Sequence, residues 1–148
     1  MLNPKVVAAI GASETEESVG QSIMKNLLAG KDSRKICPVN PKRDTIMGLK
    51  CYPSVSKIPE RVDLAVVATP AKTVPTVVEE CARAGVAGVV ILSAGFREIG
   101  SEGARLEEDV KRIQAEHDIR VLGPNCVGII RPHIGLNATF LRDSPSPG

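Results

Sequence analysis

The most restrictive feature of the sequence is a short apolar run, residues 6–10 (VVAAI), that ends in the turn Gly11-Ala12-Ser13. Unbroken runs of small and β-branched residues are typical of parallel strands that are buried on both faces. A glycine at the end of such a strand lets the chain turn back under the next helix. The turn then aims free backbone N–H groups and the positive end of that helix at one spot. The pattern predicts an anion site there, most often for a phosphate.

The glycine spacing differs from the dinucleotide-binding fingerprint. Gly11 and Gly20 are nine residues apart, and Ser13 stands two residues after Gly11, where the fingerprint requires a glycine. A tight strand-to-helix turn without any ligand therefore remains an alternative for this feature taken alone.

The pattern of an apolar run followed by a helical repeat continues along the chain. Strands are predicted at residues 6–10, 35–39, 62–68, 88–92 and 119–122, with a weak sixth within 129–134, and helices at 19–28, 74–84 and about 101–117. Residues 42–59 contain several helix and strand breakers, so they are expected to form a loop with at most one short turn near 53–56. Strands that alternate with helices at this period predict an α/β Rossmann-like fold, with an open parallel sheet of five to six strands and helices on both faces.

Composition narrows the class of protein. The 148 residues are 43% hydrophobic but include only three aromatic side chains, so one aliphatic core is expected. The net charge of +2 comes from interspersed acids and bases, which argues against nucleic acid as a partner. No apolar run approaches the ~20 residues of a membrane span, and the N-terminus has no signal-peptide pattern. We therefore expect no membrane association and a cytoplasmic location.

The cysteines and histidines do not suggest a metal site or a nucleophile. The four cysteines contain no C-x-x-C pair and no histidine cluster accompanies them. Cys37 and Cys81 are predicted to be inert core residues. Cys126 has no nearby His or Lys to lower its pKa, so it is predicted to be a small loop residue beside a helix N-terminus. His117 follows Ile113 at helical spacing and is predicted to complete an apolar stripe, and no catalytic residue is assigned.

Candidate binding residues lie at the ends of the predicted strands, because ligands of open α/β sheets bind outside the carboxyl ends of the strands. These positions combine small residues and turn formers, which allow a ligand to approach the backbone closely. The candidates are Gly11, Ala12, Ser13, Ser18, Val19, Gly20, Asn40, Pro41, Lys42, Arg43, Ala68, Thr69, Pro70, Ser93, Ala94, Gly95, Asn125 and Cys126.

The end of the second strand distinguishes between nucleotides. A domain that binds NAD usually places Asp or Glu there for the ribose hydroxyls, whereas a phosphorylated ribose needs cations. This chain has Asn40, followed by Lys42 and Arg43. The pattern disfavours NAD and favours NADP or coenzyme A, and an exposed basic turn with no ligand remains the alternative.

The combination of these motifs resembles a known family, the coenzyme A-binding domain of the nucleoside-diphosphate-forming (ADP-forming) acyl-CoA synthetases, related to the succinyl-CoA synthetase α subunit. The resemblance extends from about residue 4 to Phe140, and its motifs are jointly specific although each is weak alone. The matching segments are 10–13 with 18–20, 38–42, 48–54, 62–70, 93–96 and 122–128. Val127 stands where the succinyl enzymes have a proline, which places the chain nearer the acetyl-type, ADP-forming branch.

The resemblance implies coenzyme A or acyl-CoA as the ligand. It implies that the first glycine loop and the start of the first helix hold the phosphates, and that Lys42, with Arg43 beside it, contacts the phosphorylated adenosine. Residues 68–70 and 93–95 would line the path of adenine and pantetheine. Asn125 and Cys126 belong to the loop near which the thiol meets the acyl-phosphate or phosphohistidine.

The resemblance also implies domains beyond this sequence. The family's complete reaction converts acyl-CoA, ADP and phosphate to acid, ATP and coenzyme A through a phosphorylated histidine, with a phosphohistidine domain and an ATP-grasp domain and with homo- or hetero-oligomers. Neither His117 nor His133 matches that histidine. We therefore expect residues 1–140 to be a domain that only binds, and 141–148 to be a linker to a domain that is absent here. A stand-alone coenzyme A-binding protein, an NADP-binding oxidoreductase domain and a ligand-free scaffold or sensor remain alternatives.

Overall fold

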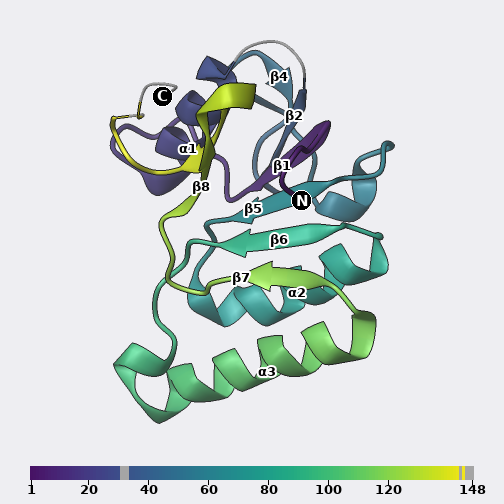
Figure 1. Ribbon diagram of the computed structural model, residues 1–148, viewed down its shortest axis with the longest axis vertical. Coiled ribbons are helices and arrows are strands. Elements are labelled where there is room, and N and C mark those ends of the chain that lie inside the picture. Colours follow the sequence, from purple (N-terminus) through teal and green to yellow (C-terminus); the bar gives the residue numbers. More distant parts are fainter. Residues whose placement is uncertain (31–33, 144, 146–148) are drawn as a thin grey trace.

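A five-stranded parallel sheet forms the centre of the computed structural model, which describes residues 1–30, 34–143 and 145 (Figure 1). Its strands are β1 (Val6–Ile10), β2 (Lys35–Val39), β5 (Leu64–Val67), β6 (Gly88–Ile91) and β7 (Arg120–Leu122). They lie in the order β2-β1-β5-β6-β7, so the chain moves to one side of β1 first and then to the other. The crevice of such a sheet opens where the strand order reverses, between β1 and β5. The predicted Rossmann-like α/β fold is confirmed, with five strands in the sheet.

Helices cover both faces of the sheet, as predicted. Helix α1 (Val19–Ala29) lies on one face, and α2 (Val74–Arg83) and α3 (Ser101–His117) pack together on the other (Figure 1). Short 3₁₀ turns connect these elements. They are η1 (Val55–Lys57), η2 (Ala71–Thr73), η3 (Arg97–Ile99) and η4 (Pro132–Ile134). Among the described helices, none is long and apolar enough to cross a membrane.

The core is aliphatic and has two layers because alternate strand residues face opposite sides of the sheet. In β1, Ala8 and Ile10 pack toward α2 and α3, whereas Val7 and Ala9 pack toward α1. Cys37 and Cys81 are buried in the first of these layers, which confirms their assignment to the core. Burial raises the pKa of Cys81 to about 12, so this thiol stays protonated and inert.

The prediction of a plain loop over residues 42–59 is wrong, because a small hairpin forms within it. Strands β3 (Thr45–Ile46) and β4 (Leu49–Lys50) pair antiparallel. The two residues between them, Met47 and Gly48, both have positive φ angles, 50° and 77°. A two-residue turn of this kind matches the twist of the flanking strands, and the Gly48 position was its sequence signal.

The weak sixth strand forms, but it does not join the parallel sheet. Strand β8 (Gly128–Arg131) pairs antiparallel with β9 (Leu136–Thr139), and β9 packs against α1. All four residues of β9 are buried, although the sequence analysis assigned no strand there. Gly135 supplies the left-handed residue, with φ +65°, that returns the chain between the two strands. This hairpin completes the covering of the α1 face.

The third helix has its predicted bounds, but the predicted stripe is shorter. Val110 and Ile113 are buried, Leu106 is half-buried and His117 is exposed. His117 is the last residue of α3, and the left-handed Asp118 then turns the chain toward β7. The assignment of His117 to an apolar stripe is therefore wrong. Lys111 and Glu107, four residues apart on α3, form an ion pair, with 3.7 Å between Nζ and Oε1.

A glycine in α3 provides a test of how closely this helix packs. A Cβ atom at Gly103 would lie 1.7 Å from the Phe96 carbonyl oxygen. Helix propensity alone predicts that Gly103→Ala stabilises the protein by about 1 kcal/mol. We expect the opposite, a loss of about 1–3 kcal/mol in the free energy of unfolding, because the helix must move away from the η3 turn. Urea denaturation followed by circular dichroism measures the change, with the exposed Ser101→Ala as the control; a stabilised Gly103→Ala variant would contradict the close packing.

Candidate functional site

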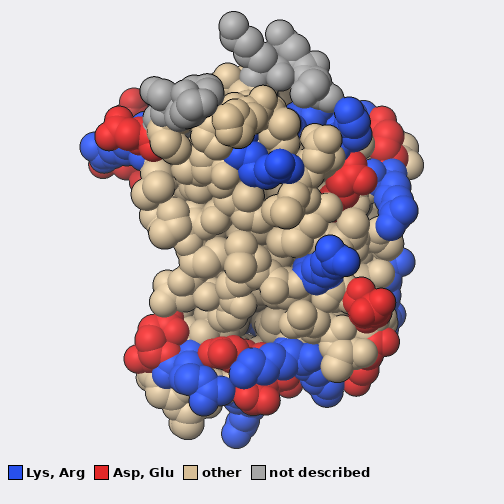
Figure 2. All heavy atoms as spheres, viewed as in Figure 1, with Lys and Arg blue, Asp and Glu red and all other residues tan. Residues whose placement is uncertain are grey.

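The carboxyl ends of the strands form one rim. Ile10 lies opposite Val39 in β2 and opposite Val67 in β5, and Val67 lies opposite Ile91 in β6, so these strands end at the same level. Figure 2 shows the molecule hollowed at its left edge, on the side to which the arrows of β5, β6 and β7 point in Figure 1. The surface of this hollow is largely uncharged (Figure 2). Leu122, the last residue of β7, lies opposite Val90 of β6, and the candidate residues follow all five strand ends.

Hydrogen bonds join the loops after β1 and β2. The Gly11 N–H donates to the Val39 carbonyl oxygen at 3.1 Å. The Asn40 side chain spans both loops: its Nδ2 donates to the Ala12 carbonyl oxygen at 3.0 Å, and its Oδ1 accepts the Lys42 N–H at 2.9 Å. The Asn40 side chain therefore connects the predicted phosphate loop to the predicted basic turn.

The two predicted glycines allow α1 to start directly against the β1 turn. Gly11 has φ +90°, and a Cβ there would lie 2.7 Å from the Ala68 carbonyl oxygen. A Cβ at Gly20 would lie only 2.1 Å from the Gly11 carbonyl oxygen. Gly20 thus serves close packing between helix and strand, the task that the third glycine performs in dinucleotide-binding turns. As a result the N-terminus of α1 lies at the rim.

The serine hydroxyls shape the first loop. Ser18 is the N-cap of α1: its Oγ accepts the Gln21 N–H at 3.1 Å and donates to the Thr15 carbonyl oxygen at 2.7 Å. Ser13 Oγ accepts the Thr15 N–H at 3.0 Å. Because the Ser18 hydroxyl already caps Gln21, the donors that the helix can still offer to an anion are the N–H groups of Val19 and Gly20, which have no partner within a helix.

The two basic residues after β2 differ in their environment. Arg43 Nη2 lies 3.0 Å from Glu14 Oε2, and the other Glu14 oxygen accepts the Met47 N–H of the β3–β4 hairpin. Lys42 is exposed and forms no ion pair with the described residues. Arg43 therefore fastens the first loop to the hairpin, whereas the Lys42 ammonium is available for a ligand. Sequence reasoning missed Glu14, since a single acidic residue in a loop carries no pattern.

The loops after β5, β6 and β7 are also joined. Ser93 Oγ donates to the Thr69 carbonyl oxygen at 2.6 Å, and the Asn125 N–H donates to the Ser93 carbonyl oxygen at 3.0 Å. The Gly95 N–H donates to the carboxylate of Glu98, and this bond lowers the pKa of Glu98. The β6 part of the rim therefore carries a negative charge, in contrast to the cationic turn after β2.

Thr69 holds a polar atom that the described part of the chain leaves unsatisfied. Its Oγ1 is buried and has no hydrogen-bond partner there. A buried hydroxyl without a partner costs about 1–3 kcal/mol, so a native structure needs a reason to keep one. Its position at the end of β5, beside the reversal of strand order, fits a rim that receives a ligand with hydrogen-bonding groups.

Cys126 is held as a structural residue. Its Sγ donates to the Ile91 carbonyl oxygen at 3.3 Å, and burial raises the pKa of the thiol. The predicted helix N-terminus is absent from this part of the described chain, because residues 123–127 lead from β7 directly into β8. Among the residues that the structure describes, no group of three or more His, Cys, Asp or Glu side chains could hold a metal ion.

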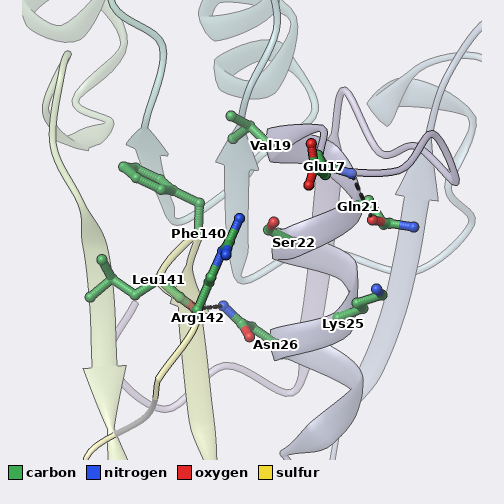
Figure 3. Close-up of a pocket in the computed structure, with 9 residues that line it drawn as sticks. All are labelled: Glu17, Val19, Gln21, Ser22, Lys25, Asn26, Phe140, Leu141 and Arg142. Atoms are coloured by element: carbon green, nitrogen blue, oxygen red, sulfur yellow. Dashed lines mark hydrogen bonds between the residues drawn. The ribbon is translucent and has the colours of Figure 1, made fainter.

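A separate cavity of about 540 Å³ lies between α1 and the segment after β9 (Figure 3). Of the predicted site residues it contains only Val19. Asn26 anchors the segment by donating to the carbonyl oxygens of Thr139 and Leu141, both at 2.8 Å. The Arg142 side chain runs between Phe140 and α1 (Figure 3).

Comparison with known proteins decides the class of ligand. A family model described as a CoA binding domain matches residues 5–132. The chain belongs to this family of coenzyme A-binding domains. It is 52% identical over 145 residues to acetate–CoA ligase (ADP-forming) I of Archaeoglobus fulgidus, a match that covers 98% of this chain and 21% of that protein. It is 44% identical over 139 residues to acetate–CoA ligase (ADP-forming) II subunit alpha of Pyrococcus furiosus, with 94% of this chain and 30% of that protein covered.

A solved structure supports the same family assignment. The dinucleotide forming acetyl-coenzyme A synthetase 1 of Ca. Korarchaeum cryptofilum, in complex with phosphate and ADP, superposes with a TM-score of 0.88 at 42% identity. The match covers 94% of this chain and 30% of that one. The family resemblance and coenzyme A as the cofactor are thereby confirmed for this coenzyme A-binding domain. The chain spans only 21% to 30% of the length of these three proteins.

The thiol of Cys126 yields a prediction about reactivity. Because its pKa is raised, less thiolate is present at a given pH than for an unperturbed thiol, and the thiolate is the reactive form. We expect the folded coenzyme A-binding domain to react with iodoacetamide at pH 7.5 more slowly per thiol than glutathione does. Mass spectrometry after timed alkylation measures the rate, and denatured protein is the control. Alkylation of Cys126 as fast as that of glutathione would contradict a half-buried thiol with a raised pKa.

Proposed function

We propose that this chain is the coenzyme A-binding part of an ADP-forming acyl-CoA ligase, of the acetate-activating branch. The reaction of the whole enzyme would be acyl-CoA + ADP + phosphate to acid + ATP + coenzyme A. The observation that carries this proposal is the continuous rim, in which hydrogen bonds join the candidate loops after β1 and β2 and those after β5, β6 and β7. The ligase relatives support it, and coenzyme A would supply the thiol that carries the acyl group.

Charge divides the proposed site into two ends. The first glycine loop and the N–H groups at the start of α1 would hold the diphosphate, and the free ammonium of Lys42 would contact the ribose phosphate of adenosine, with Asn40 and Arg43 fixing these loops. Residues 68–70 and 93–95, which are uncharged and follow β5 and β6, would line the path of adenine and pantetheine. Asn125 and Cys126 would lie near the thiol end. The residues proposed for binding remain Gly11, Ala12, Ser13, Ser18, Val19, Gly20, Asn40, Pro41, Lys42, Arg43, Ala68, Thr69, Pro70, Ser93, Ala94, Gly95, Asn125 and Cys126.

The remaining steps would belong to other parts of the enzyme. We assign the phosphohistidine and ATP-grasp domains to sequence beyond this one, in a homo- or hetero-oligomer in the cytoplasm. In this proposal residues 1–140 bind coenzyme A and 141–148 form the linker; residues 144 and 146–148 lie outside the described part of the chain. The chain alone would bind coenzyme A without turnover.

Lys42→Ala tests the phosphate end of the site. We expect coenzyme A to stabilise the protein against heat in a concentration-dependent manner. Lys42→Ala should raise the Kd for coenzyme A about tenfold or more, because a charge-assisted contact contributes about 1.5–3 kcal/mol. Arg43→Ala should have a smaller effect, since Arg43 is already paired with Glu14. Isothermal titration calorimetry measures these affinities.

Dephospho-coenzyme A and Lys57→Ala serve as controls. Dephospho-coenzyme A lacks the ribose phosphate, so wild type and Lys42→Ala should bind it equally. Lys57 is an exposed lysine of η1, and its removal should leave the affinity for coenzyme A unchanged. Equal affinities of wild type and Lys42→Ala for coenzyme A would show that the basic turn is only surface, and binding of NADPH but not coenzyme A would favour an oxidoreductase.

A further inference from the structure

The Thr69 hydroxyl is a buried polar group that the folded chain leaves without a partner. Less than 1 Å² of Oγ1 is accessible, and no described residue accepts or donates a hydrogen bond there. Thr69 follows β5 directly, and its Cγ2 would lie 3.3 Å from a Cβ at Gly11. It thus stands at the reversal of strand order, where the crevice of this fold opens.

Neighbouring groups are already engaged. The Thr69 carbonyl oxygen accepts the Ser93 hydroxyl at 2.6 Å, and the next carbonyl along the chain, that of Pro70, accepts the Thr73 hydroxyl at 2.7 Å. The Thr69 hydroxyl therefore has no hydrogen-bond partner in a turn whose two neighbouring carbonyl oxygens both accept one. Rotation about its Cα–Cβ bond, between the staggered positions that threonine commonly adopts, would present the hydroxyl to a ligand at the rim.

The charges around the rim indicate which part of a ligand this hydroxyl would meet. The Glu98 carboxylate is bonded to the Gly95 N–H, and Lys72 beyond the turn is paired with Glu102 at 3.7 Å. A phosphate is disfavoured near an unneutralised carboxylate, and the free cation Lys42 follows β2, which β1 separates from β5. The hollowed surface is also largely uncharged (Figure 2). A neutral polar group suits this position.

We propose that Thr69 is a specificity-determining residue whose hydroxyl is kept unpaired in the free chain and hydrogen-bonds a neutral polar group of bound coenzyme A. That group is a ring nitrogen of adenine or an amide of pantetheine. The proposal rests on the proposed function. The unpaired hydroxyl would then lower the stability of the free protein, and the hydrogen bond to the ligand would remove this cost.

The experiment compares Thr69→Val with wild type in two measurements on the 148-residue chain. Valine has nearly the same shape but no hydroxyl, so the free variant should melt about 2–4 °C higher. Its Kd for coenzyme A should rise about three- to tenfold, because one hydrogen bond to the ligand is lost. Thr69→Ser keeps the hydroxyl and should retain wild-type affinity.

Thr73→Val is the matched control. Its hydroxyl makes a hydrogen bond in the free protein, so its removal should lower the melting temperature and leave the Kd for coenzyme A unchanged. Adenosine 3′,5′-bisphosphate and 4′-phosphopantetheine identify the ligand group: Thr69→Val should weaken the fragment that carries it. Wild-type affinity of Thr69→Val for coenzyme A, or a fall in its melting temperature like that of Thr73→Val, would overturn the proposal. Failure of wild type to bind coenzyme A would instead overturn the proposed function.

Discussion

The close approach of α1 to the β1 turn is the constraint on which the rest of the site depends. A side chain at Gly20 would meet the Gly11 carbonyl oxygen at 2.1 Å, so only glycine allows the helix to begin where it does. The helix start in turn places Ser18 as the cap of Gln21 and leaves the N–H groups of Val19 and Gly20 without a partner within the helix. The proposed anion site would be made of backbone, so it would need this placement more than any particular side chain, and the spacing of glycines can differ from the dinucleotide fingerprint.

Polar groups at the rim are shared between loops, and this sharing makes five separate strand ends one surface. Asn40 connects the first two loops, and Ser93 connects the third with the fourth. Glu14 adds a link from the first loop to the β3–β4 hairpin through Arg43. Among the groups that these bonds leave uncommitted in the described chain are the Lys42 ammonium and the Thr69 hydroxyl. One is charged and the other neutral, in keeping with a ligand that has a phosphorylated end and an uncharged end.

Sequence patterns predicted the sheet, the three helices and the positions of the rim loops, because burial on both faces produces continuous apolar runs and burial on one face produces helical spacing. They failed where structure depends on contacts distant in the sequence. The β8–β9 hairpin is stabilised by the packing of β9 against α1. The sequence of β9, Leu-Asn-Ala-Thr, has no strong alternation of apolar and polar residues that would predict a strand. Glu14 matters because it pairs with Arg43 of another loop, and Thr69 because its hydroxyl has no partner in the described chain. No local sequence pattern predicts either feature.

The two edges of the sheet differ in how they can be extended. Beside β2, Tyr52 forms a parallel bridge with Val39, and its N–H donates to the Pro38 carbonyl oxygen at 3.0 Å. Pro38 also lacks the N–H that an incoming strand would need. Within the described chain β7 is the opposite edge and has only three residues. Both edges are thus poor templates for strand addition, which protects a parallel sheet rich in valine and isoleucine from self-association.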